Sequence, residues 1–313
     1  MTAATLDTQN AGWYRFKIGD LECTTIWDGY IHHAYDGLFP NGDPAELARL
    51  KVEYRLPEDH IPMDLNPAVV NTGDKLILID AGMGTYSEMF GDTMGRTTEN
   101  LIAAGIDPAD IDVVLMTHLH PDHSFGLIDG QGNAIYKNAD LYVSNPDWAE
   151  WTDEGNLGRS DHKGPWTEGT LAAVKPYRDR LKLFEMGDDI MPGVKTMSVA
   201  GHSLGQTAFI FESGGEKVVF TGDVAHHQVF DPVHPEWFFH NDYDSDPQLG
   251  ADAKAEIFAK VVDENIRYHG YHFPFPGIGD MARASDGNYR FHGDAFTPRL
   301  RVHSFDLPMR GED

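Results

Sequence analysis

Four residues with metal-binding side chains lie within six positions of the segment THLHPDHSFG, directly after the apolar run IDVVLM. They are His118, His120, Asp122 and His123. His118 and His120 alternate along an extended segment, so their side chains point to the same side. Pro121 ends that strand and is suited to begin a helix, which puts Asp122 and His123 in its first turn. A lone histidine here is more often a hydrogen-bonded structural residue, but four ligand types in the spacing H-x-H-x-D-H favour a metal site.

Three further candidate ligands each end an apolar strand and begin a loop that carries Gly or Pro. His202 follows VKTMSVAG, Asp223 follows KVVF in the triplet TGD, and His272 begins HFPFPG. An Asp after Gly is common in turns, so each residue alone is a weak signal. Together with the first four they make five histidines and two aspartates, a ligand set that suits Zn, Mn, Fe or Co. Asp223 is predicted to bridge two metals, with open positions left for water as catalytic sites require.

The strands and helices of the chain predict how these residues come together. Strand-like runs open each half, beginning with a hairpin signal at Gly19-Asp20, and helical patterns flank them. Helices are predicted at residues 95–104, 146–154 and 167–179, and from Pro247 onward with Asp246 as the N-cap. One last strand and a loop are predicted after that helix. This order fits an α+β fold, a four-layer αββα sandwich. It forms one domain at residues 13–313, with a flexible polar arm at residues 1–12.

The composition narrows the functions open to such a site. The 313 residues carry 50 acidic and 24 basic side chains, a formal net charge of −26. This balance argues against nucleic acid and against an anionic membrane as partners, because both attract Lys and Arg. Cys23 is the only cysteine, which excludes a thiolate metal cluster. No signal-peptide pattern and no run near ~18 apolar residues is present, so a cytoplasmic protein is expected.

The motifs THLHPDH, GHSLGQT and TGD, followed by a terminal His, resemble those of the metallo-β-lactamase-fold hydrolase superfamily, whose members share the αββα sandwich. The resemblance covers most of the chain in the expected order. It implies seven ligands, of which Asp223 bridges the two metals. The ligands implied for the first metal are His118, His120 and His202, and those for the second are Asp122, His123 and His272.

Residues next to the ligands are predicted to support them. Asp80, in LILIDAG, matches a family Asp that orients a ligand His, and a simple turn Asp is the alternative. His226 stands three residues after Asp223, where N-acyl homoserine lactonases place a substrate-orienting Tyr. His226 and its neighbour His227 are predicted to support a ligand or to face the substrate. The other histidines, His33 among them, have no ligand-like context and are expected mostly on the surface or in loops.

A narrower branch of the superfamily is indicated by the opening GWYRFKIGDLECTTIWDG, by HFPFPGIG and by the C-terminal YRF. These segments look like those of the methyl parathion hydrolases and their lactonase relatives. Members of this branch often carry His after FPGIG, where this chain has Asp280. The His at position 226 does not support hydrolysis of quorum-signal lactones, although it does not exclude it.

The resemblance implies a metal-dependent hydrolase with two divalent metal ions, Zn by preference and Mn, Co or Fe as alternatives. A metal-bridging hydroxide would attack an ester-like bond of a small, fairly apolar substrate, with Asp122 and Asp223 as the catalytic carboxylates. The substrate classes are a lactone, an aryl ester or an organophosphate triester. Alternatives on the same fold are an iron-dependent oxidoreductase similar to sulfur dioxygenases, and a β-lactam hydrolase. The small-molecule substrate is the expected partner, and a homodimer is a further expectation.

Four aromatic residues are predicted to line the mouth of the site, namely Phe125, Trp148, Trp151 and Phe273. Phe125 directly follows the first ligand group, where Gly is common in the family. Packing in the core or on a helix face is the alternative and is the more frequent fate of such side chains.

Overall fold

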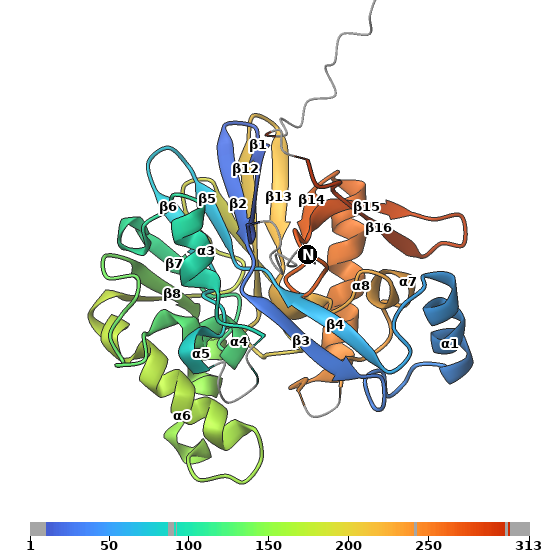
Figure 1. Ribbon diagram of the computed structural model, residues 1–313, viewed down its shortest axis with the longest axis horizontal. Coiled ribbons are helices and arrows are strands. Elements are labelled where there is room, and N and C mark those ends of the chain that lie inside the picture. The colour runs from blue at the N-terminus through green and yellow to red at the C-terminus, as the bar shows by residue number, and fades with distance from the viewer. Residues whose placement is uncertain (1–10, 87–90, 92, 241–242, 298–299, 301–313) are drawn as a thin grey trace, which may run out of the picture.

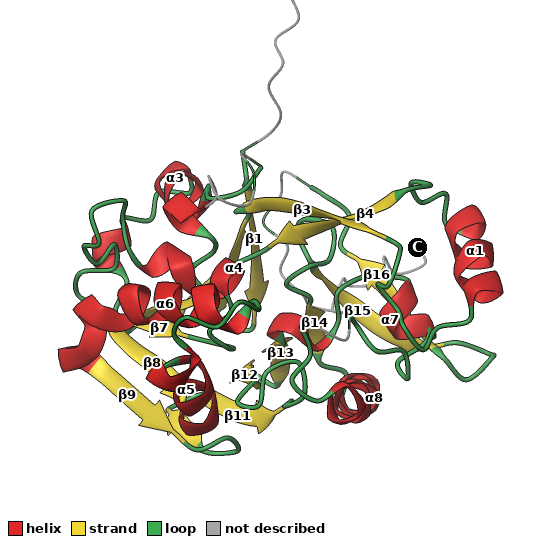
Figure 2. Cartoon of the chain, turned by 90° about the horizontal axis from the view of Figure 1, so that it is seen from below, coloured by secondary structure: helices red, strands yellow, loops and turns green. Residues whose placement is uncertain are grey.

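Two β-sheets packed face to face, with helices outside both, make up the computed structural model (Figures 1 and 2). The structure describes residues 11–300 apart from 87–90, 92, 241–242 and 298–299. Most of the predicted arm at residues 1–12 therefore lies outside the described residues. Within the described chain each of the two large sheets has seven strands, and a separate pair of strands forms a third, small sheet.

The first sheet carries Asp80 and the H-x-H-x-D-H segment at the ends of its central strands. Its hairpin β1–β2 turns at Gly19-Asp20 as predicted, and β6 to β9 run parallel. Parallel strands end at the same edge of a sheet, so the residues after β6 and β7 lie side by side. Its strands in spatial order are β1 (Trp13–Ile18), β2 (Leu21–Ile26), β5 (Ala68–Asn71), β6 (Leu76–Ile79), β7 (Val113–Leu115), β8 (Asp140–Ser144) and β9 (Leu181–Phe184).

The second sheet carries the remaining candidate ligands. Its strands in spatial order are β10 (Asp189–Met191), β11 (Val194–Ser198), β12 (Thr207–Ser213), β13 (Glu216–Phe220), β14 (Arg267–His269), β15 (Ile278–Arg283) and β16 (Tyr289–Gly293). Strands β13 and β14 are parallel, which brings Asp223 and His272 to one edge. The prediction of one last strand after the long helix was incomplete, because β15 and β16 extend the sheet beyond β14.

Three apolar layers hold the sandwich together. The layer between the sheets includes Phe16, Val70, Phe209 and Phe220, all nearly inaccessible to water. A second layer lies between the first sheet and its helices, and a third lies under the long helix α8 (Pro247–Asp263). The helices over the first sheet are α3 (Thr97–Ala103), α5 (Asn145–Trp151) and α6 (Lys163–Val174). The four-layer αββα prediction is confirmed.

A smaller unit at one side of the sandwich was not fully predicted. Strands β3 (Gly29–Ala34) and β4 (His60–Leu65) form an antiparallel pair, with helix α1 (Pro44–Glu53) between them in sequence. Apolar side chains of this unit pack with those of α7 (Phe230–Val233) in a separate cluster. Strand β4 has no counterpart among the predicted strands. In Figure 1 the pair lies below the labelled strands β12 to β14 and passes in front of the lower part of α8.

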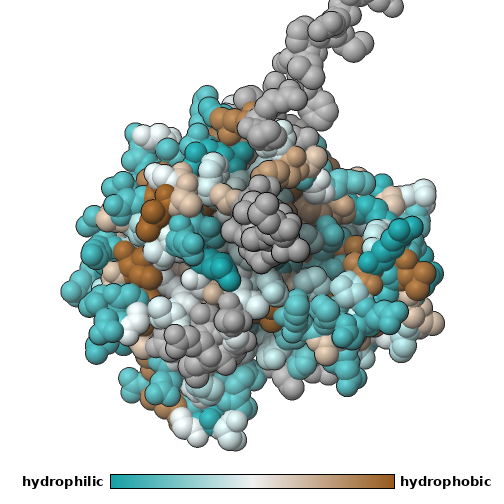
Figure 3. All heavy atoms as spheres, viewed as in Figure 1, coloured by the Kyte–Doolittle hydropathy of each residue, from teal (hydrophilic) through white to brown (hydrophobic). Residues whose placement is uncertain are grey.

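The surface of the face shown in Figure 3 is mostly hydrophilic, with small and separate hydrophobic patches between the polar side chains. This agrees with the large excess of acidic residues in the sequence. Among the described helices, none is both long enough and apolar enough to span a bilayer.

Candidate metal centre

His118, His120 and His202 form the first of two groups of candidate ligands, named here the nitrogen cluster. One ring nitrogen from each lies within 4.8 Å of the others. The rings of His118 and His120 have centroids 4.5 Å apart, as expected for alternate residues on one side of an extended segment. His202 arrives from the other sheet, after β11, and its ring centroid is 4.6 Å from that of His120. The three rings are buried.

Asp122, His123, Asp223 and His272 form the second group, named here the mixed cluster because it contains nitrogen and oxygen donors. One donor atom of each lies within 4.8 Å of the others. Asp223 Oδ1 is 3.0 Å from His123 Nε2, and Asp223 Oδ2 is 3.0 Å from His272 Nε2. Asp223 Oδ2 is also 3.4 Å from His202 Nε2. The Asp223 carboxylate therefore lies between the two clusters, where the sequence predicted a bridging residue.

Local backbone geometry explains why these residues meet. Helix α4 (Pro121–Ser124) begins at the proline as predicted and turns Asp122 and His123 toward the clusters. Gly222 has φ of +55°, and a Cβ atom there would lie 2.5 Å from Thr117 Oγ1. Only glycine allows both the left-handed conformation and this close approach. The triplet TGD thus brings Asp223 against the end of β7.

Hydrogen bonds at Nδ1 fix the tautomer of most of these histidines. His123 donates to Asp80 Oδ2 at 2.8 Å, and His202 donates to Asp244 Oδ1 at 2.8 Å. His272 donates to the carbonyl oxygen of Asp64 at 2.9 Å. A ring that donates from Nδ1 keeps its Nε2 lone pair for a ligand. The Nε2 atoms of all three rings face Asp223.

Asp80 is the centre of a second layer of contacts behind the clusters. It accepts hydrogen bonds from the Thr117 amide at 2.8 Å and the Thr117 hydroxyl at 2.7 Å, in addition to that from His123. The Thr117 oxygen in turn lies 3.1 Å from His118 Nδ1. Asp80 itself has φ of +58°, a strained conformation that the surrounding hydrogen bonds stabilise. One buried carboxylate thus orients a histidine of each cluster.

The unpaired atoms in the clusters fit a metal site. Among the described residues, the buried Nε2 atoms of His118, His120, His123 and His202 have no hydrogen-bond partner, nor has Asp223 Oδ1. Buried polar atoms without a partner are costly and uncommon in native proteins. Imidazole nitrogens and carboxylate oxygens converging within metal-binding distance remove that cost when they coordinate a divalent cation. The donor set therefore fits two such cations.

The electrostatics of the two clusters differ. Burial lowers the pKa of His118 and His120 well below the usual range, which keeps both rings neutral. Burial also opposes protonation of His123, but the carboxylates of Asp223, Asp122 and Asp80 outweigh it and raise its pKa. Burial works against the charge of Asp223 as well, yet the neighbouring His123 and His272 hold its pKa well below the usual value. Ionised Asp223 thus faces imidazoles that favour their protonated form in the mixed cluster, whereas His118 and His120 of the nitrogen cluster are neutral.

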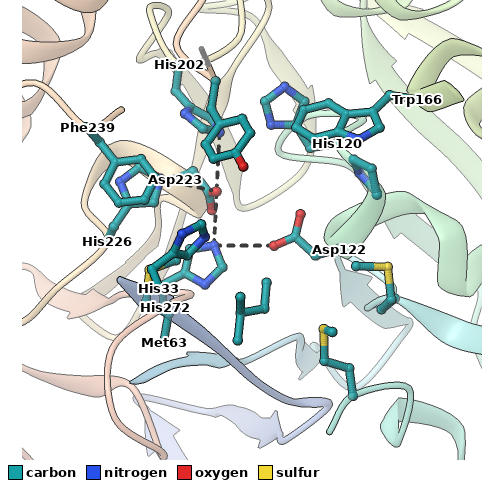
Figure 4. A pocket seen from close by; sticks show the side chains of 15 residues that line it. His33, Met63, His120, Asp122, Trp166, His202, Asp223, His226, Phe239 and His272 are labelled. Carbon is teal, nitrogen blue, oxygen red and sulfur yellow. Dashed lines mark hydrogen bonds and ion pairs between the residues drawn. The ribbon is translucent and has the colours of Figure 1, made fainter. Parts of the chain in front are cut away.

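A cavity of about 180 Å³ opens onto both clusters, and Figure 4 shows side chains from several elements pointing into it. Six of its lining residues belong to or adjoin the clusters, namely His120, Asp122, His202, Asp223, His226 and His272. The opposite wall is apolar and is lined by Ile31, Met63, Met83 and Met94, while Phe239 lies beside His226 on the side of the clusters. His33, Trp166 and Tyr243 complete the lining together with Pro121. The cavity therefore has one polar side, with the candidate ligands, and one apolar side.

The four aromatic residues predicted to line the site do not line this cavity, and that prediction is corrected. Phe273 is fully buried in the core under α8, because its ring packs against Tyr268 and Phe291. Phe125 is buried, and a Cβ atom on Gly169 would lie 2.2 Å from its ring. Trp148 and Trp151 pack with the core of the first sheet. Trp151 supports the site from behind, because its ring contacts His120 with 4.7 Å between the centroids.

Several residues at the site were missed by sequence reasoning. Trp166 lines the cavity and stacks on Tyr243, with ring centroids 5.7 Å apart. His33 was expected on the surface or in a loop, but it faces the cavity from β3, and burial lowers its pKa to about 4. Asp244, which holds His202, also carried no motif. The one nearby signal was the N-cap at Asp246, which indicated that a helix begins just after this loop.

The two histidines after the bridging position have different surroundings. His226 lines the cavity, and its Nε2 lies 3.4 Å from Asp223 Oδ2. His227 is turned away from the cavity, with its ring against Phe230.

The comparisons agree with this geometry. The family model for the metallo-beta-lactamase superfamily matches residues 62–266. Because this match spans more than half of the 313 residues, the chain belongs to the metallo-β-lactamase superfamily. The matched segment includes all of the candidate ligands except His272.

Two solved structures of this fold are similar over nearly the whole chain. One is the hydrolase AbOPH of the beta lactamase superfamily, with 30% identity and a TM-score of 0.85 over 93% of this chain and 100% of that chain. The other is AidC, a dizinc quorum-quenching lactonase in complex with the product N-hexanoyl-L-homoserine. It has 26% identity and a TM-score of 0.83, and covers 91% of this chain and 98% of that chain.

Among curated proteins, an N-acyl homoserine lactonase of Bacillus thuringiensis is 25% identical over 177 residues, which is 50% of this chain and 62% of that protein. A "probable metallo-hydrolase" of Methanocaldococcus jannaschii is 43% identical over 58 residues, 17% of this chain and 26% of that protein. Both matches thus span less than two thirds of the relatives' own lengths. They support a metallo-hydrolase family with lactonase homologues.

Proposed function

We propose that the chain is a dinuclear metal-dependent hydrolase that opens an ester-like bond of a small, fairly apolar substrate, with a lactone as the first candidate. The observation that carries this proposal is the pair of ligand clusters that share Asp223 and open onto one cavity with an apolar far wall. The similarity to a dizinc lactonase supports the metal and the substrate class. Aryl esters and organophosphate triesters present the same combination of one polar reacting group and apolar substituents. Zn is the proposed metal, and Mn, Co and Fe suit the same donors.

The division of the cavity suggests how a substrate is held. Its reacting carbonyl would face the clusters, and its apolar part would contact Ile31, Met63 and Met94 on the opposite wall. Contacts on both sides fix the distance between the carbonyl carbon and an attacking water, which is the main gain from positioning. Methionine side chains adapt to different apolar shapes, so this wall is suited to more than one acyl or alkyl group.

Bound divalent cations supply Lewis acidity and a water molecule of lowered pKa. The protein side of the chemistry falls to Asp122 and Asp223. Asp122 faces the cavity with 14% of its side chain exposed, and its Oδ2 is 3.4 Å from His272 Nε2. Its carboxylate is in position to take up the proton that the attacking water loses and to return it to the leaving group. Asp223, buried between the clusters, keeps its charge and holds both halves of the centre together.

The test is a substrate panel run on protein of known metal content. Metal-free protein and protein reconstituted with Zn²⁺ are assayed against N-hexanoyl homoserine lactone, an aryl ester, a phosphotriester and a β-lactam. We expect turnover of the lactone after reconstitution and none in the metal-free sample. Fully loaded protein that hydrolyses no member of the panel would contradict the proposal. Oxygen uptake by the iron-loaded protein with a sulfur substrate would instead identify an oxidoreductase.

A further inference from the structure

His226 is a buried histidine whose ring nitrogens, Nδ1 and Nε2, make no hydrogen bond to the described residues. Its side chain is 2% exposed. A neutral imidazole has one nitrogen that donates and one that accepts, and burying both without a partner is unfavourable. Four other rings relieve this at Nδ1 through a hydroxyl, a carboxylate or a carbonyl, namely those of His118, His123, His202 and His272. His226 has no such contact, so its surroundings imply a ligand.

The ring of His226 is held in one orientation. It stacks on Phe239 with centroids 3.5 Å apart and an interplanar angle of 7°. Its backbone amide donates to Asp231 Oδ2 at 2.9 Å, and Asp231 is fixed by a buried ion pair with Lys254 at 2.5 Å. The imidazole is therefore set in place before any ligand arrives, as a metal ligand must be. Figure 4 shows His226 beside Phe239, on the same side of the cavity as Asp223 and His202.

The position of Nε2 suits a cation as the ligand. It lies 3.4 Å from Asp223 Oδ2, and one donor atom each from His202, Asp223 and His226 lie within 4.8 Å of one another. His202 already uses Nδ1 for Asp244, so it has a single lone pair to offer and serves a single cation. A cation within reach of His226 is consequently the one that the nitrogen cluster holds.

His227 provides the contrast. It is as deeply buried, at 3% exposure, but its Nδ1 accepts a hydrogen bond from the Val229 amide at 3.2 Å. Its ring packs against Phe230, 4.6 Å between centroids, and does not line the cavity. Two consecutive histidines with similar burial thus have different surroundings. The packing of His227 is complete without a ligand, and that of His226 is not.

We propose that His226 is an eighth ligand of the centre, which adds a fourth imidazole to the cation held by His118, His120 and His202. This inference rests on the dinuclear centre proposed above. It makes the two sites chemically unequal. His202 belongs both to the group of His118 and His120 and to a group with Asp223 and His226. With both groups on one cation, the first site would have four imidazoles and a share of Asp223, whereas the second would have two imidazoles and two carboxylates. Nitrogen-rich sites favour Zn²⁺, Co²⁺ and Ni²⁺, and carboxylate-bearing sites also accept Mn²⁺. The first site is therefore expected to bind Co²⁺ first and more tightly.

The experiment compares His226→Phe with His227→Asn in the full-length protein. Phenylalanine keeps the stacking on Phe239 and removes both nitrogens. Asparagine keeps an acceptor for the Val229 amide and removes only the outer nitrogen of His227. Metal-free wild type and both variants are titrated with Co²⁺ against a competing chelator, and the visible d–d bands of the protein with one equivalent bound are recorded. If His226→Phe lacks a cooperative unfolding transition, His226→Asn takes its place.

We expect the Kd for the first Co²⁺ to rise by about tenfold or more in His226→Phe, since even indirect partners of ligands change metal affinity by ~10–100-fold. The d–d bands of this variant should change, while His227→Asn should match wild type. A Kd and a spectrum of His226→Phe equal to those of wild type would overturn the inference. Metal binding is measured without substrate, so failure of every hydrolysis assay would contradict the proposed function and leave this test valid.

Discussion

The nitrogen cluster and the mixed cluster share Asp223 but are supported by different kinds of structure. His123 of the mixed cluster is oriented by Asp80, which follows β6 and is fixed by Thr117 at the end of the neighbouring strand. His202 of the nitrogen cluster is oriented by Asp244, in the loop that leads to α8. That loop also supplies Phe239 and Tyr243 to the cavity. The orientation of His123 in the mixed cluster thus depends on the first sheet. The orientation of His202 in the nitrogen cluster depends on a loop that also lines the cavity.

The largest loss of metal binding and activity is expected from Asp223→Ala, because this carboxylate lies between the two clusters. Losing it removes a donor from each site and leaves the neighbouring cationic groups without their counter-charge. We expect metal content to fall from two ions to one or fewer and kcat/KM to fall by more than the ~10–100-fold typical of supporting residues. Metal analysis and lactone hydrolysis measure this. Asp280→Asn is the control, since Asp280 is 54% exposed and pairs with Arg267. Wild-type turnover by Asp223→Ala would remove the basis for a shared centre.

A pH-dependent effect on stability is expected from a buried acid behind the nitrogen cluster. Asp147 accepts from the Ser203 hydroxyl, next to His202, and its Oδ2 has no hydrogen-bond partner among the described residues. Burial raises its pKa to about 7, above the unfolded value of 3.8. Its stabilising contribution is therefore complete below pH ~4 and is lost as pH rises through 7.

Asp147→Asn removes this dependence. Relative to wild type, the variant should gain about 2 kcal/mol in free energy of unfolding between pH 5.5 and pH 8.5, at 1.36 kcal/mol per pKa unit. Denaturant unfolding of the metal-free proteins at the two pH values measures the difference. Parallel stability profiles for the two proteins would show that Asp147 is ionised throughout this range.

The variants Asp80→Asn and Asp244→Asn each remove a carboxylate that orients a ligand histidine, the first behind His123 and the second behind His202. Asp244→Asn should lower the affinity of the nitrogen cluster for metal by ~10–100-fold, and Asp80→Asn that of the mixed cluster, because the orienting carboxylate of a ligand histidine is lost. Asp80→Asn should affect the nitrogen cluster less, because Asp80 reaches His118 only through Thr117. Asp80→Asn should in addition lower the melting temperature of the metal-free protein, since Asp80 accepts three buried hydrogen bonds. Asp244→Asn should not. Chelator competition and thermal unfolding measure the two properties. Equal thermal losses would mean that the loop is as integral to the fold as the sheet.

The smallest effect is expected at the wall opposite both clusters. Met63→Ala enlarges the apolar side of the cavity without touching a ligand. We expect kcat/KM to shift by about tenfold in favour of lactones with longer acyl chains, as for a change of one or two methylenes in an apolar pocket. Met191→Ala, on β10 and outside this cavity, should leave the ratio between chain lengths unchanged. Unaltered selectivity in Met63→Ala would place the acyl group elsewhere.

The predicted ligands could be found from the sequence because their signals are local. The H-x-H-x-D-H spacing needs only one strand end and one helix start, and the TGD and GHS segments each follow an apolar run. Parallel pairing then aligns such ends without further information, as β13 and β14 show. The prediction of the αββα layers succeeded for the same reason, since each strand and helix carried its own pattern.

The aromatic predictions failed because burial is not a local property. Phe125 lies next to the ligands in sequence, yet it packs toward Gly169 of α6, where no side chain occupies the space. Trp151 and Trp166 lie in consecutive helices, and only the packing of α5 and α6 decides that Trp166 faces the cavity. A cavity lined by β3, β4 and the loop before α8 joins segments about 200 residues apart. No window of sequence contains that information.

The sequence by itself determined the donor atoms of this protein: their types, their order and their places at the ends of strands. It did so because metal ligation imposes residue types and spacings that few other roles require. Only the tertiary structure decided which side chains face them, through the β3–β4 pair, the Asp244 loop and the stacking of His226 on Phe239. Those contacts form between distant segments, and their geometry is set by how the layers pack rather than by any residue alone.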